Sequence, residues 1–293
     1  MALKSWTRLI RFSDDNGRET FGEPIVSSDK EFTERIAGGD LYAVELRGSN
    51  PISNLVPGGK IHVHALLDIL RPDDVPIIRC IGLNYIKHIR EGGRTPPPFP
   101  SVFIKPSTSV AGYVEDIPIT KIAQDGTLDY EGELAIVIGK TGKDIPKEAA
   151  LSYIAGYLAA NDVSARGWQR DPKKAGGVPQ WCFSKGFDKF APLSPMLVSP
   201  SIVGNASDLT LRTLVNGEER QNTSTGDLLF GVEDIVSFCS QGTTLQAGTV
   251  ILTGTPSGVA MGMKEPKYLH DGDVVEVQIS GLGSVKNKIV FEN

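Results

Sequence analysis

The sequence predicts a β-rich α+β fold with a small N-terminal domain. Glycine and proline are abundant, at 32 and 19 of 293 residues, as expected of many short strands joined by turns. Segments rich in apolar and β-branched residues predict strands at residues 7–12, 132–139, 250–254 and 274–279. Helical patterns are few, and no internal repeat or low-complexity tract is present in the sequence.

Residues 1–70 are expected to form the N-terminal domain. A strand at residues 7–12 begins it, with Ile10 and Phe12 on one face, and a short helix follows near residues 28–37. The boundary is predicted in RPDDVPII, residues 71–78, where two prolines flank two aspartates. Residues 71–293 then form the larger domain.

The larger domain should contain mostly strands and only two clear helices. These helices are predicted at residues 147–154 and 232–240, and Gly231 precedes the second. The remaining strong apolar segments, which include residues 132–139 and 274–279, are short enough to be strands.

Composition excludes several classes of protein. The chain has 30 basic and 35 acidic side chains, a net charge of −5. No basic patch indicates a nucleic-acid partner, and no apolar run is long enough to predict a membrane span. The three cysteines are odd in number and widely spaced, which favours reduced thiols in an intracellular protein; they are Cys80, Cys182 and Cys239.

The start of the chain allows two interpretations. MALKSWTRLIRF carries Lys4, Arg8 and Arg11 before its first acid, Asp14, and in this it resembles a short mitochondrial presequence. The same segment fits a first strand at residues 7–12, which we favour. The expected location is therefore the cytoplasm, with the mitochondrion as the alternative.

Two glutamates in LDYEGELAIVIGK, residues 128–140, are the best indication of a functional site. Glu131 and Glu133 are two residues apart in a predicted strand, so their carboxylates project to one face, which Asp129 shares. Apolar residues occupy the opposite face and can enter a core; they are Leu134, Ile136 and Ile138. Neighbouring carboxylates repel each other unless a proton or a cation separates them, and a hard cation such as Mg²⁺ prefers oxygen ligands. A solvated acidic face on an edge strand explains the pattern equally well.

A second acidic position favours the metal site. Asp162 follows the apolar run 157–160 in YLAANDVSARGWQ, where an unpartnered carboxylate would be unusual. It can cap a helix that starts near Ser164, or it can supply a third oxygen ligand beside Glu131 and Glu133. Three such carboxylates would leave positions for water and substrate on the metal.

At this point several motifs, in the same order, resemble the fumarylacetoacetate hydrolase superfamily. They are IGLNYIKHIRE (81–91), FIKPSTSVAG (103–112), DYEGELAIVIGK (129–140), NDVSAR (161–166), FSKGFDKFAPLSP (183–195), TLQAGTVILTGTPSGVAMG (244–262) and LHDGDVVEVQISGLGSVKNKI (269–289). The resemblance extends from about residue 77 to the end. It implies the mixed β-roll of that family, usually a homodimer, with residues 71–293 as the catalytic domain.

The resemblance implies that the segment around His88 is a lid and that His88 and Glu91 are a catalytic pair. In a helical turn these residues share a face, and a carboxylate raises the basicity of a neighbouring imidazole. Without the resemblance, a surface ion pair would be the better interpretation. The Gly- and Pro-rich tract 91–100 fits a loop that closes over a site. The other histidines are expected to be structural; they are His62, His64 and His270.

The resemblance also assigns substrate contacts. Lys185 would stabilise an anionic substrate, and Arg166 and Gln169 match positions that contact a keto-acid end. Thr255, in a Thr-Gly-Thr-Pro turn, would contact a carboxylate. From the residues alone, Lys185 can instead be a snorkelling core lysine and the turn can simply end a strand. Lys105 is expected to pack beneath the site.

These parts predict Mg²⁺-dependent cleavage of a C–C bond in a small 2,4-diketo acid, of the acylpyruvate or fumarylpyruvate type, through a metal-bound enolate. Mn²⁺ and Ca²⁺ are alternative ions, and a small dicarboxylate is an alternative substrate. The same enolate would serve an oxaloacetate decarboxylase or a keto–enol tautomerase, so these reactions stay open. An inactive, metal-stabilised partner protein is the remaining alternative.

One departure from the family concerns the residues ahead of His88. Members that act on fumarylacetoacetate itself bring an additional acidic ligand from this segment. Here residues 80–85 contain no acid, and only Asn84 offers a side-chain oxygen. This difference argues against fumarylacetoacetate as substrate and favours the smaller, pyruvate-type members of the family, which have three carboxylate ligands on the metal.

Overall fold

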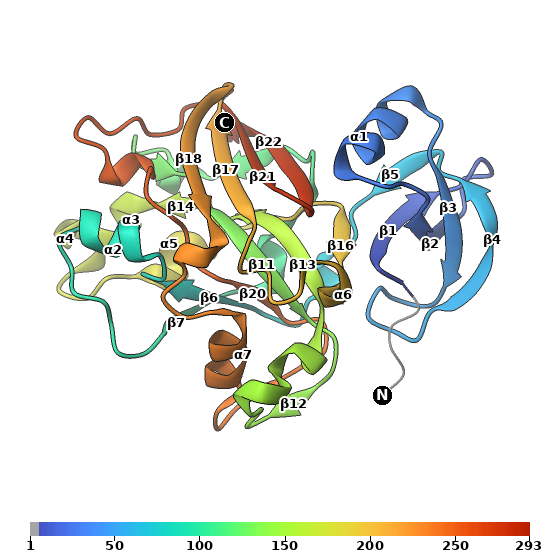
Figure 1. Cartoon of the computed structure of the whole chain (residues 1–293). Helices are drawn as coiled ribbons and strands as arrows, with labels where there is room; N and C mark the ends of the chain where they lie inside the picture. The colour runs from blue at the N-terminus through green and yellow to red at the C-terminus, as the bar shows by residue number, and fades with distance from the viewer. Residues whose placement is uncertain (1–5) are drawn as a thin grey trace.

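The structure, a computed structural model, describes residues 6–293. Strands β1–β5 and helix α1 form an N-terminal lobe beside the larger body (Figure 1). The lobe is joined to the body by hydrogen bonds as well as by the chain, because β1 pairs antiparallel with β16. The predicted division at residue 70 stays a prediction. The basic start that suggested a presequence lies partly in residues 1–5, outside the described residues.

The main sheet has eleven strands and crosses both lobes. β5 (Ala65–Leu67) pairs with β1, and the other ten follow in space as β4 (Val56–His62), β3 (Tyr42–Arg47), β2 (Glu19–Pro24), β1 (Arg8–Ser13), β16 (Met196–Val198), β13 (Ile154–Asn161), β11 (Gly132–Ile138), β20 (Val250–Leu252), β6 (Ile78–Gly82) and β7 (Ser101–Lys105). The pair β20–β6 is parallel and the other pairs are antiparallel, so the sheet is mixed.

A second sheet packs against the central strands of the first. Its order is β18 (Glu218–Ser224), β17 (Thr210–Val215), β21 (Val274–Ile279), β22 (Gly283–Phe291) and β9 (Ile117–Ile119). Three short pairs complete the strands; they are β10 (Leu128–Asp129) with β14 (Ser164–Ala165), β12 (Gly142–Lys143) with β19 (Thr244–Leu245), and β8 (Val110–Ala111) with β15 (Ala191–Pro192).

β11 is buried on both faces because it lies between two apolar clusters. Leu134, Ile136 and Ile138 pack in one cluster with β17 and β21, as the alternation of the sequence predicted. Ala135 and Val137 pack in the other cluster with β13 and β20. Glu133, the second residue of β11, therefore lies in a strand that has no solvated face, and its carboxylate needs a local partner.

Helices are short and lie at the edges of the sheets. They are α1 (Asp29–Gly38), α2 (Ile86–Glu91), α3 (Arg166–Arg170), α4 (Pro172–Ala175), α5 (Trp181–Lys185), α6 (Pro200–Val203) and α7 (Val232–Ser240). Single 3₁₀ segments occupy Pro72–Asp74, Ser107–Ser109, Lys121–Ala123, Lys147–Tyr153, Thr225–Asp227 and Ala260–Gly262. Ser28 caps α1 by accepting from the Glu31 N–H, and Gly39 ends it with φ 67°.

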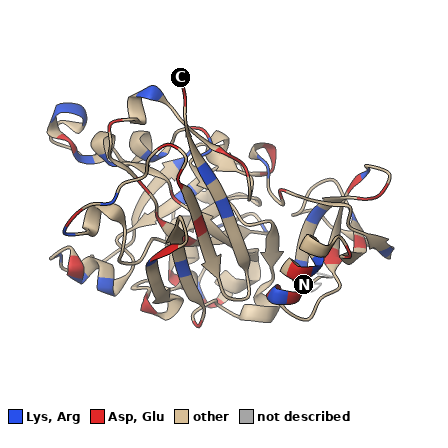
Figure 2. Ribbon diagram, turned by 90° about the horizontal axis from the view of Figure 1, so that it is seen from above, with Lys and Arg blue, Asp and Glu red and all other residues tan. Residues whose placement is uncertain are grey.

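The predicted fold class is confirmed, since strands dominate and all four predicted strands form. Helices occur at the three predicted places, although residues 147–153 are 3₁₀. Basic and acidic residues are interspersed over both lobes (Figure 2). The three cysteines are free. Across residues 6–293, no helix combines the length and the apolar character needed to cross a membrane.

Candidate active site

A cavity of about 410 Å³ lies beside α2, α3 and α5, where several strands of the main sheet end. β6 contributes Ile81 and Gly82, and Thr255 follows the end of β20. Glu131 reaches the cavity from the link between β10 and β11. Seven of the nine predicted site residues line the cavity; they are His88, Glu91, Glu131, Arg166, Gln169, Lys185 and Thr255.

Beside the cavity, Glu131, Glu133 and Asp162 bring one oxygen each to within 4.8 Å of one another. All three are buried, so the alternative of a solvated acidic face is wrong. Two hydrogen bonds hold the link between β10 and β11 beside Asp162. The Asp162 N–H donates to the Glu131 carbonyl at 2.8 Å, and the Glu131 N–H donates to the Asn161 side chain at 2.9 Å. Asp162 does not cap a helix, since α3 begins at Arg166 with Ala165 as its cap.

The charge of this triad fits a divalent cation. Burial raises the pKa of Glu133 well above its usual value, and the negative charges of Asp162 and Glu131 raise it further. The Gly254 N–H donates to Glu133 at 2.6 Å but does not reverse this shift. A hard cation bound by these three buried carboxylates would compensate the repulsion between them, and carboxylate oxygens are the ligands that such a cation prefers.

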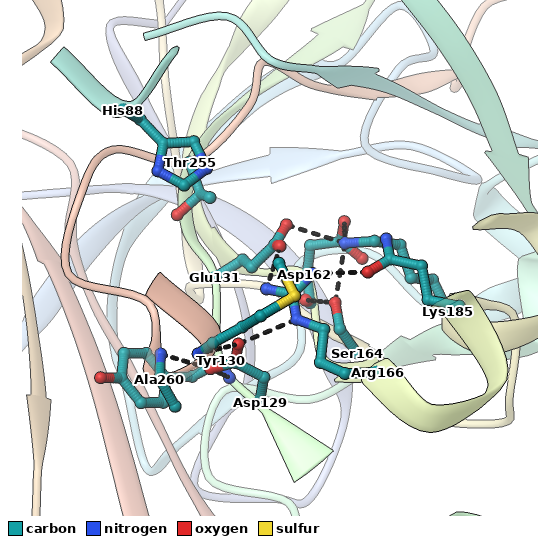
Figure 3. Close-up of polar contacts among 12 residues, drawn as sticks. His88, Asp129, Tyr130, Glu131, Asp162, Ser164, Arg166, Lys185, Thr255 and Ala260 are labelled. Atoms are coloured by element: carbon teal, nitrogen blue, oxygen red, sulfur yellow. Dashed lines mark hydrogen bonds and ion pairs between the residues drawn. The ribbon is translucent and has the colours of Figure 1, made fainter. Parts of the chain in front are cut away.

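Two buried lysines already lie against the triad. Lys185 Nζ donates to Glu131, Asp162 and Ser164, each at 2.7 Å (Figure 3). Lys105 Nζ donates to the other oxygen of Asp162 at 2.6 Å. Burial lowers the pKa of Lys185, but the charges of Asp162 and Glu131 outweigh that effect and raise it overall. Both lysines are therefore hydrogen-bond donors to the carboxylates of the triad.

Arg166 holds the acidic side of the cavity in place. Its Nε donates to Asp129 at 2.8 Å and its Nη2 contacts Glu131 at 2.5 Å. Burial would raise the pKa of Glu131, but the positive charges of Arg166 and Lys185 hold it at about 2. Arg166 Nη1 donates to Gln169 Oε1 at 3.1 Å, which leaves the Gln169 amide nitrogen to face a ligand.

The predicted pair His88 and Glu91 lies on α2. Figure 3 shows His88 apart from the ion-pair network. His88 Nδ1 is 3.6 Å from Glu91 Oε2, slightly beyond hydrogen-bond distance. Nδ1 is buried and has no other hydrogen-bond partner among residues 6–293. A small rotation of the Glu91 side chain would bring the two atoms to hydrogen-bond distance. Catalytic hydrogen bonds are often this long when no ligand is bound.

Asn84 is anchored in the protein and is not a ligand in the triad. Its Oδ1 accepts from the Phe230 N–H at 2.9 Å, and its Nδ2 donates to the Thr253 and Phe230 carbonyls. Gly254 lies against it with φ +100°, where an added Cβ would come within 2.9 Å of the Asn84 side chain. Asn84 therefore joins the start of the predicted lid segment to the end of β20.

Thr255 lines the cavity with its hydroxyl already bonded. Its Oγ1 donates to the Gly132 carbonyl at 3.0 Å and accepts from Gln221 at 2.8 Å. A substrate contact through this hydroxyl therefore requires that it give up the bond to Gly132.

The sequence analysis did not predict that Lys105 bonds directly to a residue of the triad. It was expected beneath the site, and it is fully buried with a direct bond to Asp162. Phe103 and Lys105 share one face of β7, and Val102 and Ile104 share the other. Hydrophobicity favours the face with Val102 and Ile104 as the inward one, which would leave Lys105 on the solvent side. Asp129 and Ser164 are further partners that the sequence analysis did not assign.

Comparisons with known proteins identify the family. A model of the fumarylacetoacetate (FAA) hydrolase C-terminal family matches residues 77–290. A mitochondrial oxaloacetate tautomerase of Xenopus laevis is 40% identical over 78% of this chain and 69% of its own length. Caffeoylpyruvate hydrolase of Neonothopanus nambi is 37% identical over 98% of this chain and 94% of its own length.

Solved structures give the same result for the fold. A 5-carboxymethyl-2-hydroxymuconate delta-isomerase from Mycobacterium smegmatis has a TM-score of 0.78 and 33% identity, over 97% of this chain and all of its own. The relatives include a hydrolase, a tautomerase and an isomerase, so they share a scaffold and differ in reaction. On the family match and these identities, the chain belongs to the fumarylacetoacetate hydrolase family.

Proposed function

We propose that this protein is a Mg²⁺-dependent enzyme that cleaves a C–C bond in a small 2,4-diketo acid of the acylpyruvate type. The observation that carries the proposal is the buried triad of Glu131, Glu133 and Asp162 beside a cavity that also receives His88 and Glu91. Mg²⁺ held by these three carboxylates would polarise the keto oxygen of the substrate and stabilise negative charge on it. The homodimer that the family resemblance implies is part of this proposal.

Residues of the cavity would orient the substrate, stabilise developing charge and transfer a proton. Gln169 and Arg166 would orient the keto-acid end, because both polar groups line the cavity and Arg166 is held rigidly by Asp129. Lys185 would donate a hydrogen bond to the oxygen on which charge develops, after it gives up one of its three bonds to Glu131, Asp162 and Ser164. His88, oriented by Glu91, would take a proton from the water that attacks the acyl carbonyl. The bond between the two halves of the diketo acid then breaks, and the pyruvate half leaves as its enolate.

Keto–enol isomerisation of oxaloacetate is the second candidate. It is favoured by the relatives named as oxaloacetate tautomerases, at 40% identity, and it would use the same Lys185 and His88 without an attacking water. Decarboxylation of oxaloacetate needs fewer catalytic groups, because loss of CO₂ requires charge stabilisation but no base. Whether a water reaches the substrate carbonyl separates hydrolysis from the other two reactions.

A panel of two substrates distinguishes these reactions. Acetylpyruvate and oxaloacetate would each be incubated with the protein, with and without Mg²⁺, while enol absorbance and products are followed. Pyruvate and acetate from acetylpyruvate support the hydrolase. Enol decay of oxaloacetate without pyruvate supports the tautomerase, and Mg²⁺-dependent pyruvate formation from oxaloacetate supports the decarboxylase. No reaction with either compound, in protein that binds Mg²⁺, would contradict the proposal.

Binding of Mg²⁺ should release protons from the site. The raised pKa of Glu133 favours the protonated carboxyl in the metal-free protein, and the metal must displace that proton. The affinity for Mg²⁺ should therefore rise with pH until it passes that pKa. Titration calorimetry in buffers of different ionisation enthalpy measures the release. Glu133→Gln has no such proton and should bind weakly without releasing one; an unchanged affinity in this variant would remove Glu133 from the ligand set.

The lid should become more protected when substrate analogues bind. Tyr85 and Ile89 hold its start in the core, whereas residues 90–96 are exposed and Phe99, at 66% exposure, stacks on Phe238 of α7 at 6.1 Å. Hydrogen exchange across this segment should slow when Mg²⁺ and oxalate are added together. α1 in the N-terminal lobe serves as the internal reference. Unchanged exchange in residues 84–100, with oxalate bound, would mean that the lid does not close.

A further inference from the structure

Two arginines lie at the cavity without a part in the chemistry above. Arg94 follows α2 in the lid segment, and Arg170 is the last residue of α3 in the body of the enzyme. Both line the same cavity as the triad, and both are exposed, in contrast to the buried Arg166. They bring two positive charges to the entrance from two separate segments.

Neither arginine has an acidic partner. Within residues 6–293, no Asp or Glu lies at ion-pair distance from Arg94 or Arg170, whereas Arg166, one turn earlier on α3, pairs with two carboxylates. The Arg170 side chain donates instead from Nη1 to the Met261 sulfur, at 3.5 Å. Partial burial, and then the positive charges of Arg94 and Arg166, lower the pKa of Arg170. Both guanidinium groups therefore bring positive charge to one cavity.

The acidic groups of the cavity are already engaged. Glu131 pairs with Arg166 and Lys185, and Glu91 faces His88. An anion that enters the cavity is thus the available partner for the two arginines. A carboxylate suits them, because a planar guanidinium donates two parallel hydrogen bonds to it.

We propose that Arg94 and Arg170 bind a second carboxylate of the substrate, at the end opposite to the keto acid, so that the enzyme prefers dicarboxylic substrates. This proposal rests on the proposed function, since it assumes that the keto-acid end lies at the triad. Because Arg94 belongs to the lid segment and Arg170 to α3, the second carboxylate links the two and favours the closed lid. Substrates with an uncharged end lose this link.

The spacing on α3 limits the length of the substrate. Arg166 and Arg170 are four residues apart in one helix, so they are neighbours on the same face, at about 6 Å between Cβ atoms. A binding position for the keto-acid end beside Arg166 is therefore adjacent to one beside Arg170. This arrangement suits short diacids, in which a few carbons separate the two carboxylates.

Binding of unreactive keto acids tests the proposal without catalysis. 2-Oxoglutarate carries a second carboxylate, and 2-oxohexanoate has an alkyl end in its place. Their dissociation constants would be measured by calorimetry with the full chain in saturating Mg²⁺. The wild type should bind 2-oxoglutarate about tenfold more tightly, the usual contribution of a hydrogen-bonded ion pair. Arg170→Gln and Arg94→Gln should each lose most of this preference while binding of 2-oxohexanoate stays the same.

Two further variants separate a specific contact from a general effect of charge. Arg90→Gln removes an exposed arginine of α2 that does not line the cavity, and it should keep the wild-type preference. Arg170→Lys keeps the charge and should keep part of the preference. An equal loss of 2-oxoglutarate affinity in Arg90→Gln and Arg170→Gln would overturn the proposal, as would equal affinities of the wild type for the two acids. Failure of both acids to bind with Mg²⁺ present would instead contradict the proposed function.

Discussion

Replacement of His88 by alanine should lower the rate of acylpyruvate hydrolysis by about a hundredfold or more, the usual contribution of a positioned acid–base group. The imidazole lies on α2, apart from the ion-pair network around the triad (Figure 3), so its removal should leave binding of Mg²⁺ and oxalate unchanged. Decarboxylation of oxaloacetate should suffer less, because it needs no activated water. The measurements are single-turnover rates with acetylpyruvate and oxaloacetate, and calorimetry with oxalate.

Two controls make this result specific. Glu91→Gln keeps the size of the side chain and removes the charge that supports the imidazole, so it should reduce hydrolysis less than His88→Ala does. His62→Ala changes a histidine of the N-terminal lobe that bonds Asp15 and the Gly39 carbonyl, and it should leave both rates unchanged. Equal hydrolysis rates for His88→Ala and the wild type, at saturating Mg²⁺ and substrate, would show that another residue is the base.

The parts of the site that could be predicted are those in which local spacing fixes geometry. Glu131 and Glu133 are two residues apart at the start of a buried strand, and Asp162 follows its partner strand, so pairing of β11 with β13 brings the three together. The apolar face of β11 followed from the same alternation. The position of His88 and Glu91 on one helical turn also followed from their spacing.

Features that depend on contacts distant in sequence could not be predicted. The inward face of β7 carries Phe103 and Lys105, while Val102 and Ile104 are 43% and 46% exposed, the reverse of what hydrophobicity suggests. The ion pair with Asp162, 57 residues away, holds Lys105 inside. Pairing of β1 with β16 likewise joins residues almost 190 positions apart. The composition of residues 71–78, from which the domain boundary was predicted, contains no information about that pairing.

Replacement of Lys185 by methionine should have the second large effect, on stability and on both reactions. Lys185 is buried against Glu131 and Asp162, and removal of one partner from a buried ion pair costs about 3–5 kcal/mol. Each carboxylate keeps another cation, Arg166 or Lys105, so the lower end of that range is expected. Mg²⁺ should restore part of the lost thermal stability, since it binds the folded state and supplies the missing positive charge.

Lys105→Met provides the matched comparison, because it removes the other buried lysine from Asp162 without touching the cavity wall. Both lysines are almost fully buried, but Lys185 lines the cavity and Lys105 does not. The two variants should therefore lose similar stability in thermal unfolding without metal. The rates should differ, with hydrolysis and decarboxylation falling by about a hundredfold to a thousandfold more in Lys185→Met, the usual effect of removing a donor that stabilises developing charge. If both variants lose stability and rate in parallel, Lys185 acts only by holding the triad together, and the donor to the substrate oxygen must be sought among the other polar groups of the cavity.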